Sequence, residues 1–292
     1  MNGRWHIGVI GGSGLADGID LEDAQEIAVA SPFGAPSGPV TTGRLGAVRL
    51  TFLARHGAGH RLTPSVVNYR ANIDVLKRCG VTDLVSLSAI GSLREDMAPG
   101  HMVAVDQFID RTTSRANSFF GEGLVAHVSM ADPVCGRLSA RLADAAEATG
   151  ATVHRGGCYV AIEGPQFSTR AESLMYRQWG ADVIGMTAMP EARLAREAEL
   201  PYALLGMVTD YDCWRPHEQG VGAAEVFAVM KANAALARDA MRQLVAALPA
   251  ERGPSPVDCA LDGAFATAPN ARDGKLMAML DAVAGRVLRP WN

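Results

Sequence analysis

The sequence lacks the long apolar runs that would place the chain in or across a membrane. None of its uninterrupted apolar stretches approaches the roughly 18 residues of a membrane span. The apolar core near the start, Ile7 to Ile10, is interrupted by glycines too soon to act as the apolar region of a secretory signal peptide. We therefore expect no membrane partner and predict a cytoplasmic protein.

The sequence also has no C-x-x-C pair and no stripe of basic residues. Its five cysteines are odd in number and widely spaced, which indicates free buried thiols instead of a disulfide framework or a metal site. Lysine and arginine total 27 against 31 acidic residues, and the basic residues are scattered among the acids. Because nucleic-acid binding needs a basic stripe, we predict no nucleic-acid partner, and the cysteine pattern predicts no metal.

The glycine-rich stretch Gly11–Gly14 lacks both common nucleotide-binding motifs. It has neither the G-x-G-x-x-G spacing of dinucleotide-binding folds nor the Gly-Lys-Ser/Thr ending of a P-loop, which disfavours a dinucleotide-dependent oxidoreductase. The stretch follows the short predicted strand Ile7–Ile10. Its backbone N–H groups and the Ser13 hydroxyl can hold an anion there, although a plain tight turn has the same pattern.

What the sequence does have is a repeated order of apolar strand, polar turn and amphipathic helix. This order predicts one α/β domain with a mixed central β-sheet and helices on both faces. We place the domain at residues 1–250 and expect residues 251–292 to form a C-terminal arm and helix packed on it. The expected strands are 7–10, a hairpin within 37–54 that turns at Gly46, a strand from Asp83, 102–108, 153–162, 182–186 and 201–208. The expected helices are 65–79, 133–150, one from the capping box Thr169-x-x-Glu172 to Gly180, 190–200, 223–248 and 273–288.

The stretch Pro201–Val208 is almost wholly apolar, as in a strand buried on both faces of a sheet, and two acids, Asp210 and Asp212, follow it. If the chain stays extended there, side chains two apart share a face, so both carboxylates point into one pocket while Tyr211 points away. The carboxyl ends of strands are where open α/β sheets bind ligands. An acidic loop that caps the next helix would give the same spacing.

Other predicted strands end in groups that can bind anions. Arg55 and His56 follow the second strand of the hairpin and offer donors to an oxyanion, although a solvated strand end is also consistent with them. Ser88 lies where a buried strand enters a turn of small residues. Thr187 lies just before a predicted helix N-terminus, which favours anions. So many polar strand ends are hard to explain by packing alone.

Eight segments occur in order along the chain: Ile10-Gly-Gly-Ser-Gly14, Ala54-Arg-His56, Asn68-Tyr-Arg-Ala-Asn72, Gly91-Ser-Leu-Arg-Glu95, Asp106-Gln-Phe-Ile-Asp-Arg-Thr-Thr113, Glu163-Gly-Pro-Gln-Phe167, Arg170-Ala-Glu172 and Thr209-Asp-Tyr-Asp-Cys-Trp214. Together they resemble the 5′-methylthioadenosine phosphorylase family of trimeric purine nucleoside phosphorylases. The resemblance runs from about residue 5 to about residue 247. Motifs this numerous and ordered make it specific, and it does not cover the chain beyond residue 250.

The resemblance implies three groups of site residues. Phosphate is expected to bind Ser13, Arg55, His56, the Ser88 hydroxyl with the Ala89 backbone, and Thr187. Base and sugar are expected to contact Phe167, Ser168, Met186, Asp210, Tyr211 and Asp212. The 5′ substituent is expected to be surrounded by His127, Ala223, Val226 and Phe227, although His127 can equally be a surface-loop histidine. Family members often carry Thr at Ser13 and Ser88, which keeps the hydroxyl. Ala223 stands where a bulkier Val is common, and the lost methyls weaken discrimination of methylthio from hydroxyl by about 1–3 kcal/mol.

Two positions point to a 6-aminopurine. Enzymes of the superfamily that act on 6-oxopurines place Glu where Ser168 stands and Asn where Asp210 stands. Adenine offers an amino donor at N6, which an ionised Asp212 can accept, and an acceptor at N7, which needs a donor. Asp210 must therefore carry a proton or become protonated through the base, and burial and the charge of a neighbouring carboxylate favour that state.

The implied reaction is phosphate-dependent cleavage of 5′-methylthioadenosine to adenine and 5-methylthioribose 1-phosphate, a step of purine and methionine salvage. Arg55 and His56 would fix the phosphate and Asp210 would stabilise the leaving purine. We expect no cofactor besides the co-substrate phosphate, and a homotrimer with sites near subunit interfaces. The alternatives are a 6-oxopurine nucleoside or 5′-methylthioinosine phosphorylase of the same family, and a nucleoside-binding module without catalysis.

Overall fold

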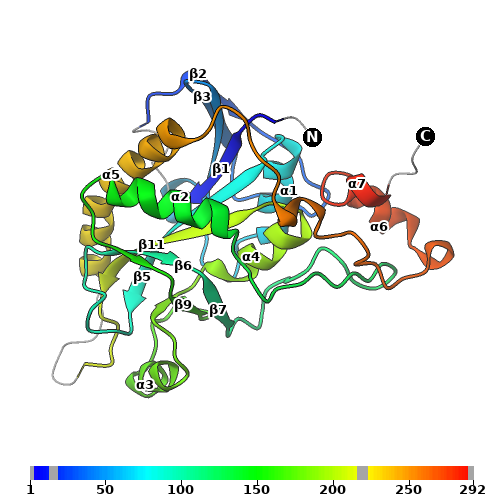
Figure 1. The fold of residues 1–292 in the computed structure, drawn as a ribbon. Coiled ribbons are helices and arrows are strands. Elements are labelled where there is room, and N and C mark those ends of the chain that lie inside the picture. The colour runs from blue at the N-terminus through cyan, green and yellow to red at the C-terminus, as the bar shows by residue number, and fades with distance from the viewer. Residues whose placement is uncertain (1–2, 13–18, 216–222, 289–292) are drawn as a thin grey trace.

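The structure is a computed structural model that describes residues 3–12, 19–215 and 223–288 (Figure 1). Its strands are β1 (His6–Gly11), β2 (Glu22–Ile27), β3 (Val40–Leu45), β4 (Val48–Ala54), β5 (Asp83–Ser92), β6 (Met102–Val105), β7 (Gln107–Asp110), β8 (Val153–Arg155), β9 (Cys158–Ala161), β10 (Val183–Gly185) and β11 (Tyr202–Asp210). Its α-helices are α1 (Tyr69–Arg78), α2 (Gly136–Glu147), α3 (Arg170–Gln178), α4 (Ala188–Glu197), α5 (Ala223–Ala247), α6 (Gly274–Met279) and α7 (Gly285–Leu288). Among these described residues, no helix is both long and apolar enough to cross a membrane.

One mixed sheet of 11 strands forms the centre of the described structure. Its main path runs β2-β3-β4-β1-β5-β10-β9-β7, and β11 pairs with both β5 and β6. β5 is parallel to β1 and β11 but antiparallel to β10. The predicted mixed sheet is therefore confirmed, and β5, with three partners, lies at its centre.

Helices cover both faces of the sheet, as the sequence predicts (Figure 1). Alternate side chains of β1 point to opposite faces, so Ile10 joins one hydrophobic cluster and Val9 joins the other. The first cluster includes α1 and α4, with Ile73 and Leu194 among its buried residues. The second includes α2 and α5, with Met241 among its buried residues. Both faces of the sheet are thus closed to water by helices.

Several predicted elements are confirmed at their ends. β3 and β4 form the expected hairpin, with Leu45 paired to Val48 across Gly46, whose φ of 58° suits glycine. The capping box at Thr169 is present and starts α3, because the Thr169 side chain accepts from Glu172 N–H while the Glu172 carboxylate accepts from Thr169 N–H. Gly180, with a φ of 80°, follows the end of this helix.

Four expected elements differ from the structure. The helix expected at 65–79 begins at Tyr69, because the Asn68 side chain caps it. The strand expected at 102–108 is two strands, β6 and β7, and the one expected at 153–162 is divided into β8 and β9 by Gly156 and Gly157, both at positive φ. The helix expected at 273–288 is divided into α6 and α7. β2 was not expected, because its polar, exposed sequence has no alternating apolar face.

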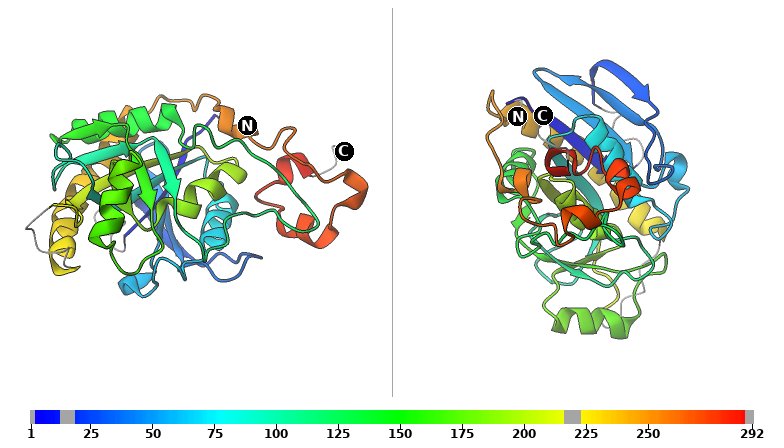
Figure 2. Two further views of the ribbon diagram at one scale, coloured as in Figure 1. Left: turned by 90° about the horizontal axis from the view of Figure 1, so that it is seen from below. Right: turned by 90° about the vertical axis from the view of Figure 1, so that its right-hand side faces the viewer.

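The segment beyond residue 250 contacts the rest of the chain through ion pairs and a few buried side chains. Arg252 donates to both Asp83, at 2.5 Å, and Asp258, at 2.6 Å, while Arg286 donates to Glu199 at 2.6 Å. α6 and α7 project to one side of the sheet (Figures 1 and 2).

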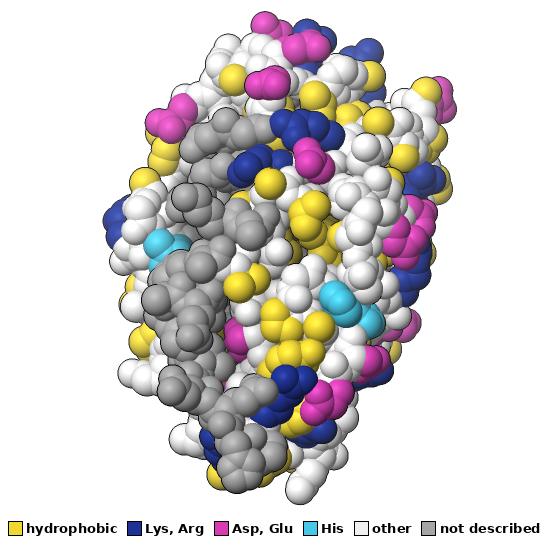
Figure 3. Space-filling view, turned by 90° about the vertical axis from the view of Figure 1, so that its left-hand side faces the viewer, with side chains coloured by type: hydrophobic (Ala, Val, Ile, Leu, Met, Phe, Trp, Pro, Cys, Tyr) yellow, Lys and Arg dark blue, Asp and Glu magenta, His cyan; other side chains and the backbone are white. Residues whose placement is uncertain are grey.

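On the opposite side, basic side chains lie next to acidic ones over the described surface (Figure 3), in keeping with the scattered charges of the sequence.

Candidate active site

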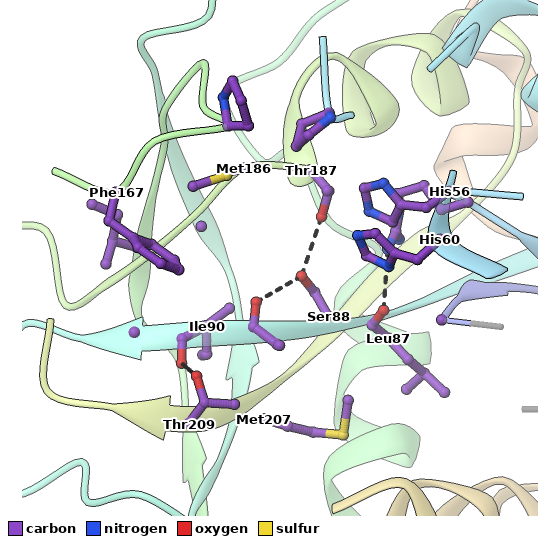
Figure 4. A pocket seen from close by; sticks show the side chains of 18 of the residues that line it. His56, His60, Leu87, Ser88, Ile90, Phe167, Met186, Thr187, Met207 and Thr209 are labelled. Carbon is purple, nitrogen blue, oxygen red and sulfur yellow. Dashed lines mark hydrogen bonds between the residues drawn. The ribbon is translucent and has the colours of Figure 1, made fainter. Parts of the chain in front are cut away.

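A cavity of about 700 Å³ lies where several strands of the sheet end. Its lining includes Gly12 after β1, Arg55 and His56 after β4, Ser88 to Gly91 within β5, Met186 and Thr187 after β10, and Thr209 and Asp210 at the end of β11. The hydroxyls of Ser88 and Thr187 and the rings of His56 and His60 gather toward one end, and Phe167 lies at the other (Figure 4). Side chains that the sequence placed at separate strand ends therefore line one cavity.

Arg55 is buried and almost fully hydrogen-bonded by the protein. Its Nε donates to Glu191 Oε2 at 2.8 Å, and its Nη2 lies 3.0 Å from Glu191 Oε1 and 2.7 Å from Ser86 Oγ. Burial by itself would lower the pKa of Arg55, but the Glu191 carboxylate offsets this and raises it well above its ordinary value. The guanidinium is therefore permanently charged, with a buried counter-ion beside it.

His56 is held in one orientation by a main-chain carbonyl. Its Nδ1 lies 2.8 Å from Leu62 O, and because a carbonyl only accepts, Nδ1 carries the proton. Burial and the charge of Arg55 lower the pKa of His56 to about 4, so the ring is neutral at pH 7 and its Nε2 is an acceptor. The His60 ring stacks on it, with centroids 4.1 Å apart. Such a histidine can accept a hydrogen bond from the hydroxyl of a protonated phosphate.

The end of the cavity that contains Arg55 and His56 also contains two hydroxyls, those of Ser88 and Thr187, near the start of α4. Ser88 Oγ lies 3.2 Å from Thr187 Oγ1 and 3.1 Å from Ala89 O. Thr187 is the N-cap of α4, and its side chain makes no capping hydrogen bond. Met189 has an extended backbone (φ −116°, ψ 135°), so the regular helix begins after it, at Pro190, and Thr187 lines the cavity with its hydroxyl in contact with Ser88. Ser13, also expected here, lies outside the described residues.

Phe167, Ser168 and Met186 form a second wall of the cavity. Phe167 is 45% exposed, so its ring has a free face in this structure. The Ser168 hydroxyl is buried and has no hydrogen-bond partner among the described residues. Met186 packs closely on Gly164, where an added Cβ would lie 2.4 Å from its sulfur. An aromatic face, a thioether and a free hydroxyl suit a planar ring with polar edges.

The buried Arg115 fixes this wall to the rest of the site. Its Nη1 donates to the carbonyls of Met186 and Met189, each at 2.6 Å. Its Nη2 donates to Glu163 O at 2.7 Å, and its Nε donates to Glu163 Oε1 at 3.1 Å. One guanidinium thus joins the segments that follow β9 and β10, which carry Phe167 and Met186.

Asp210 and Asp212 both line the cavity, as predicted, but not because the chain stays extended. β11 ends at Asp210, and the backbone N–H of Asp212, whose φ is 49°, donates back to Asp210 Oδ1 at 2.8 Å. The turn therefore brings the two carboxylates together. Gly91 makes room for them, since a Cβ there would lie 3.0 Å from Asp210 Oδ1.

The Thr209 hydroxyl lies beside Asp210 and a main-chain carbonyl. The Thr209 hydroxyl lies 3.1 Å from Ile90 O and 2.6 Å from Asp210 Oδ2, but it has only one proton. It can therefore donate to Ile90 O or to Asp210 Oδ2, but not to both at once. Burial and, to a lesser degree, the charge of Asp210 raise the pKa of Asp212, which works against the ionised Asp212 and protonated Asp210 expected from the sequence.

Some expected site residues are not found at this cavity. The Tyr211 hydroxyl donates to Glu95 O at 3.3 Å and its side chain does not line the cavity, so its assignment to the substrate contacts is not supported by this geometry. His127 lies between β7 and α2, where its backbone N–H donates to Ala264 O at 2.9 Å, away from this cavity. The side chains of Ala223, Val226 and Phe227 lie outside the described residues.

The structure also adds residues that the sequence did not single out. His60 and Arg238 line the cavity, and Arg115 and Glu191 support it. Glu191 lies in the helix expected at 190–200, where an acidic residue in the first turn is common. Arg115 lies in a polar loop that has the composition of a solvated one. In the sequence, His60 lies four residues after His56, and Arg238 lies four residues after Ala234. A spacing of four residues is too general to identify a binding site.

Comparison with known proteins gives consistent matches over nearly the whole chain. The model of the phosphorylase superfamily matches residues 6–248. The S-methyl-5′-thioadenosine phosphorylases of Cereibacter sphaeroides and Bradyrhizobium diazoefficiens are 60% and 56% identical to this chain, over 97% of it and 98% of each relative. The crystal structure of a methylthioadenosine phosphorylase from an antarctic soil metagenomic library superposes with a TM-score of 0.91 at 46% identity, covering 97% of this chain and 99% of that one.

A second solved structure carries a bound base. It is a point mutant of the adenosine/methylthioadenosine phosphorylase of Schistosoma mansoni in complex with adenine. Its TM-score is 0.80 at 34% identity, and the match covers 97% of this chain and 98% of that one.

Proposed function

Since the chain belongs to the phosphorylase superfamily, we propose that it cleaves 5′-methylthioadenosine with inorganic phosphate, giving adenine and 5-methylthioribose 1-phosphate. The observation that carries this proposal is one cavity with an anion-binding end and an end that suits a 6-aminopurine. The names of the similar proteins agree with the proposed substrate.

Phosphate binds, in this proposal, at the end of the cavity formed by Arg55, His56, Ser88 and Thr187. The two hydroxyls and the guanidinium donate to phosphate oxygens, while the neutral His56 ring accepts from the phosphate hydroxyl. The anion then lies against the anomeric carbon of the nucleoside. Its main contributions are the attacking oxygen and a negative charge that stabilises the oxocarbenium character of the transition state.

The purine binds between Phe167 and the two carboxylates. Its bond to the anomeric carbon breaks as a phosphate oxygen bonds to that carbon, and the electron pair of the broken bond stays on the purine. Asp210 gives its proton to N7, so adenine leaves as a neutral molecule. Asp212 accepts from the N6 amino group, and Ser168 has a free hydroxyl beside them.

The 5′ substituent is the part of the proposal that involves a second subunit. His127 lies away from this chain's cavity, so it can reach a 5′ group only when another copy supplies it. The proposed homotrimer, with sites near subunit interfaces, would bring a second copy of His127 to this cavity. Ala223, Val226 and Phe227 are proposed to provide the apolar part of the same pocket. We further propose a cytoplasmic enzyme that uses no cofactor beyond phosphate.

A panel of nucleosides tests the proposal. The purified protein is incubated with methylthioadenosine, methylthioinosine, adenosine and inosine, each with and without phosphate, and the free base is followed by chromatography. Adenine released only with phosphate, and fastest from methylthioadenosine, is the expected result. Hypoxanthine as the main product would mean that the assignment of Asp210 is wrong, and no base from any nucleoside would contradict phosphorolysis altogether.

A further inference from the structure

We propose that Glu191 is a positioning residue for the phosphate site: it holds the Arg55 guanidinium so that one N–H of Nη1 points to the anion. This inference rests on the proposed function and assigns a role to a carboxylate that the reaction itself does not use. Glu191 is 1% exposed and lies in the first turn of α4, four residues after Thr187 in the chain.

The hydrogen bonds of Arg55 leave little choice about which donor meets a ligand. A guanidinium has five N–H groups. Nε and Nη2 are directed to Glu191 and Ser86, with a longer contact of 3.4 Å from Nη2 to Ile10 O. One Nη1 N–H lies toward Leu87 O at 3.3 Å. The second Nη1 N–H has no acceptor among the described residues, and Arg55 lines the cavity.

Glu191 is in turn fixed by groups from the two strands β5 and β11 and by Arg55. Its Oε1 accepts from Ser86 Oγ of β5 at 2.7 Å and from Tyr202 OH of β11 at 3.0 Å, besides Arg55. Its Oε2 accepts from Arg55 Nε at 2.8 Å. A two-pronged carboxylate–guanidinium pair fixes the plane of the guanidinium as well as its position. The orientation of Arg55 is therefore set by the sheet and by α4 together.

The same pair largely cancels the charge of Arg55. A cation and an anion held at 2.8 Å present a small net charge to a third group in the cavity. His56, beside them, is neutral at pH 7 because its pKa is lowered to about 4. If Glu191 served only to compensate charge, its removal would leave Arg55 more attractive to phosphate. If it positions a donor, its removal makes phosphate bind more weakly.

Because the two roles predict opposite changes in phosphate affinity, the variant Glu191→Gln distinguishes them. The amide keeps the shape of the side chain but places N–H groups against the N–H groups of Arg55, so the pair cannot form with both prongs. The matched control is Glu197→Gln, the same change to another buried carboxylate of α4, which accepts from Ser118 and Phe119. Glu197 does not line the cavity.

The experiment measures the binding of inorganic phosphate to each protein by calorimetry in the absence of nucleoside. It also measures KM for phosphate, KM for methylthioadenosine, and thermal unfolding. We expect Glu191→Gln to weaken phosphate binding and raise its KM by about tenfold or more, because supporting hydrogen bonds to a ligand-binding side chain typically have effects of this size. KM for methylthioadenosine should change less than twofold, and Glu197→Gln should leave all three ligand constants within twofold of wild type.

Tighter phosphate binding in Glu191→Gln would overturn the inference in favour of charge compensation, and unchanged binding would reduce Glu191 to a role in stability. If Glu191→Gln does not fold, Ser86→Ala is the second variant, because it removes one contact from Arg55 and one from Glu191. It should raise KM for phosphate several-fold, and an unchanged KM would also overturn the inference. If the wild-type protein neither binds phosphate nor releases base, the proposed function is contradicted. If the wild-type protein is active and Glu191→Gln has the same phosphate affinity and KM, only the inference is contradicted.

Discussion

The replacement Asp210→Asn tests the proposed acid at N7 with little disturbance of the fold. The new amide can keep both contacts of the carboxyl group, since its oxygen still accepts from Asp212 N–H and its nitrogen donates to the Thr209 hydroxyl. Thr209 then donates to Ile90 O, which lies 3.1 Å away. The change should therefore cost less than about 1 kcal/mol of folding free energy.

Its effect on catalysis should be much larger. An amide can donate a hydrogen bond to N7 but cannot transfer a proton to it, so the leaving adenine gains no neutralising proton. Positioned acids contribute roughly 10²- to 10⁴-fold, which corresponds to about 3–5 kcal/mol of activation free energy. We expect kcat for methylthioadenosine to fall by about this factor while KM changes little. The loss should be smaller for methylthioinosine, whose base has an oxygen in place of the N6 amino group.

The assay follows adenine and hypoxanthine release at saturating phosphate, with thermal unfolding as the check on folding. An Asp210→Asn variant that releases adenine within about twofold of the wild-type rate would refute the assignment of Asp210 as the acid. A loss of the same size with both nucleosides would show that Asp210 acts in transition-state stabilisation without discriminating between the bases.

Two further predictions concern charge and pH. Arg238 lines the cavity and has no ion pair among the described residues. Arg238→Ala should therefore raise KM for phosphate about 3- to 10-fold at low ionic strength and less at high salt. Arg242→Ala, the same charge change on the same helix but outside the cavity, should leave this KM unchanged. Equal effects of the two variants would contradict a local role. Burial raises the pKa of Glu197 to about 7, so the group favours the folded state below pH 4.5 and loses this contribution as pH rises through 7. Calorimetry should show a loss of roughly 3 kcal/mol of unfolding free energy between pH 4.5 and 8 that is absent from Glu197→Gln; identical slopes would refute the assignment.

Periodic patterns were enough to predict the sheet and most of its helices. A run such as Pro201–Val208 can be buried on both faces only in the middle of a sheet, and the capping box at Thr169 starts a helix wherever it is placed. The division of the expected strand at Gly156 and Gly157 was not predictable, because an isolated pair of glycines fits a strand, a bulge or a turn equally well. The sequence likewise has no feature that distinguishes one C-terminal helix from the two short ones, α6 and α7.

The cavity was predictable where a polar group follows an apolar strand directly. Arg55, His56 and Thr187 follow strands and Asp210 ends one, but Ser88 lies inside β5 and not at the turn expected there; the cavity brings all five together. The supporting groups were not predictable, because Glu191 and Arg115 act through contacts with segments more than 40 residues away in the chain. His127 does not line the cavity of this chain, so its expected place near a 5′ substituent remains a proposal that needs a second copy.

The central claim is that the bond to the purine is broken by phosphate and not by water. Incubation with methylthioadenosine and one equivalent of phosphate, followed by phosphorus NMR, tests it directly. Phosphorolysis predicts that inorganic phosphate disappears and that one new phosphate ester, a sugar 1-phosphate, forms for each adenine released. Adenine accompanied by free methylthioribose, with the phosphate signal unchanged, would contradict it.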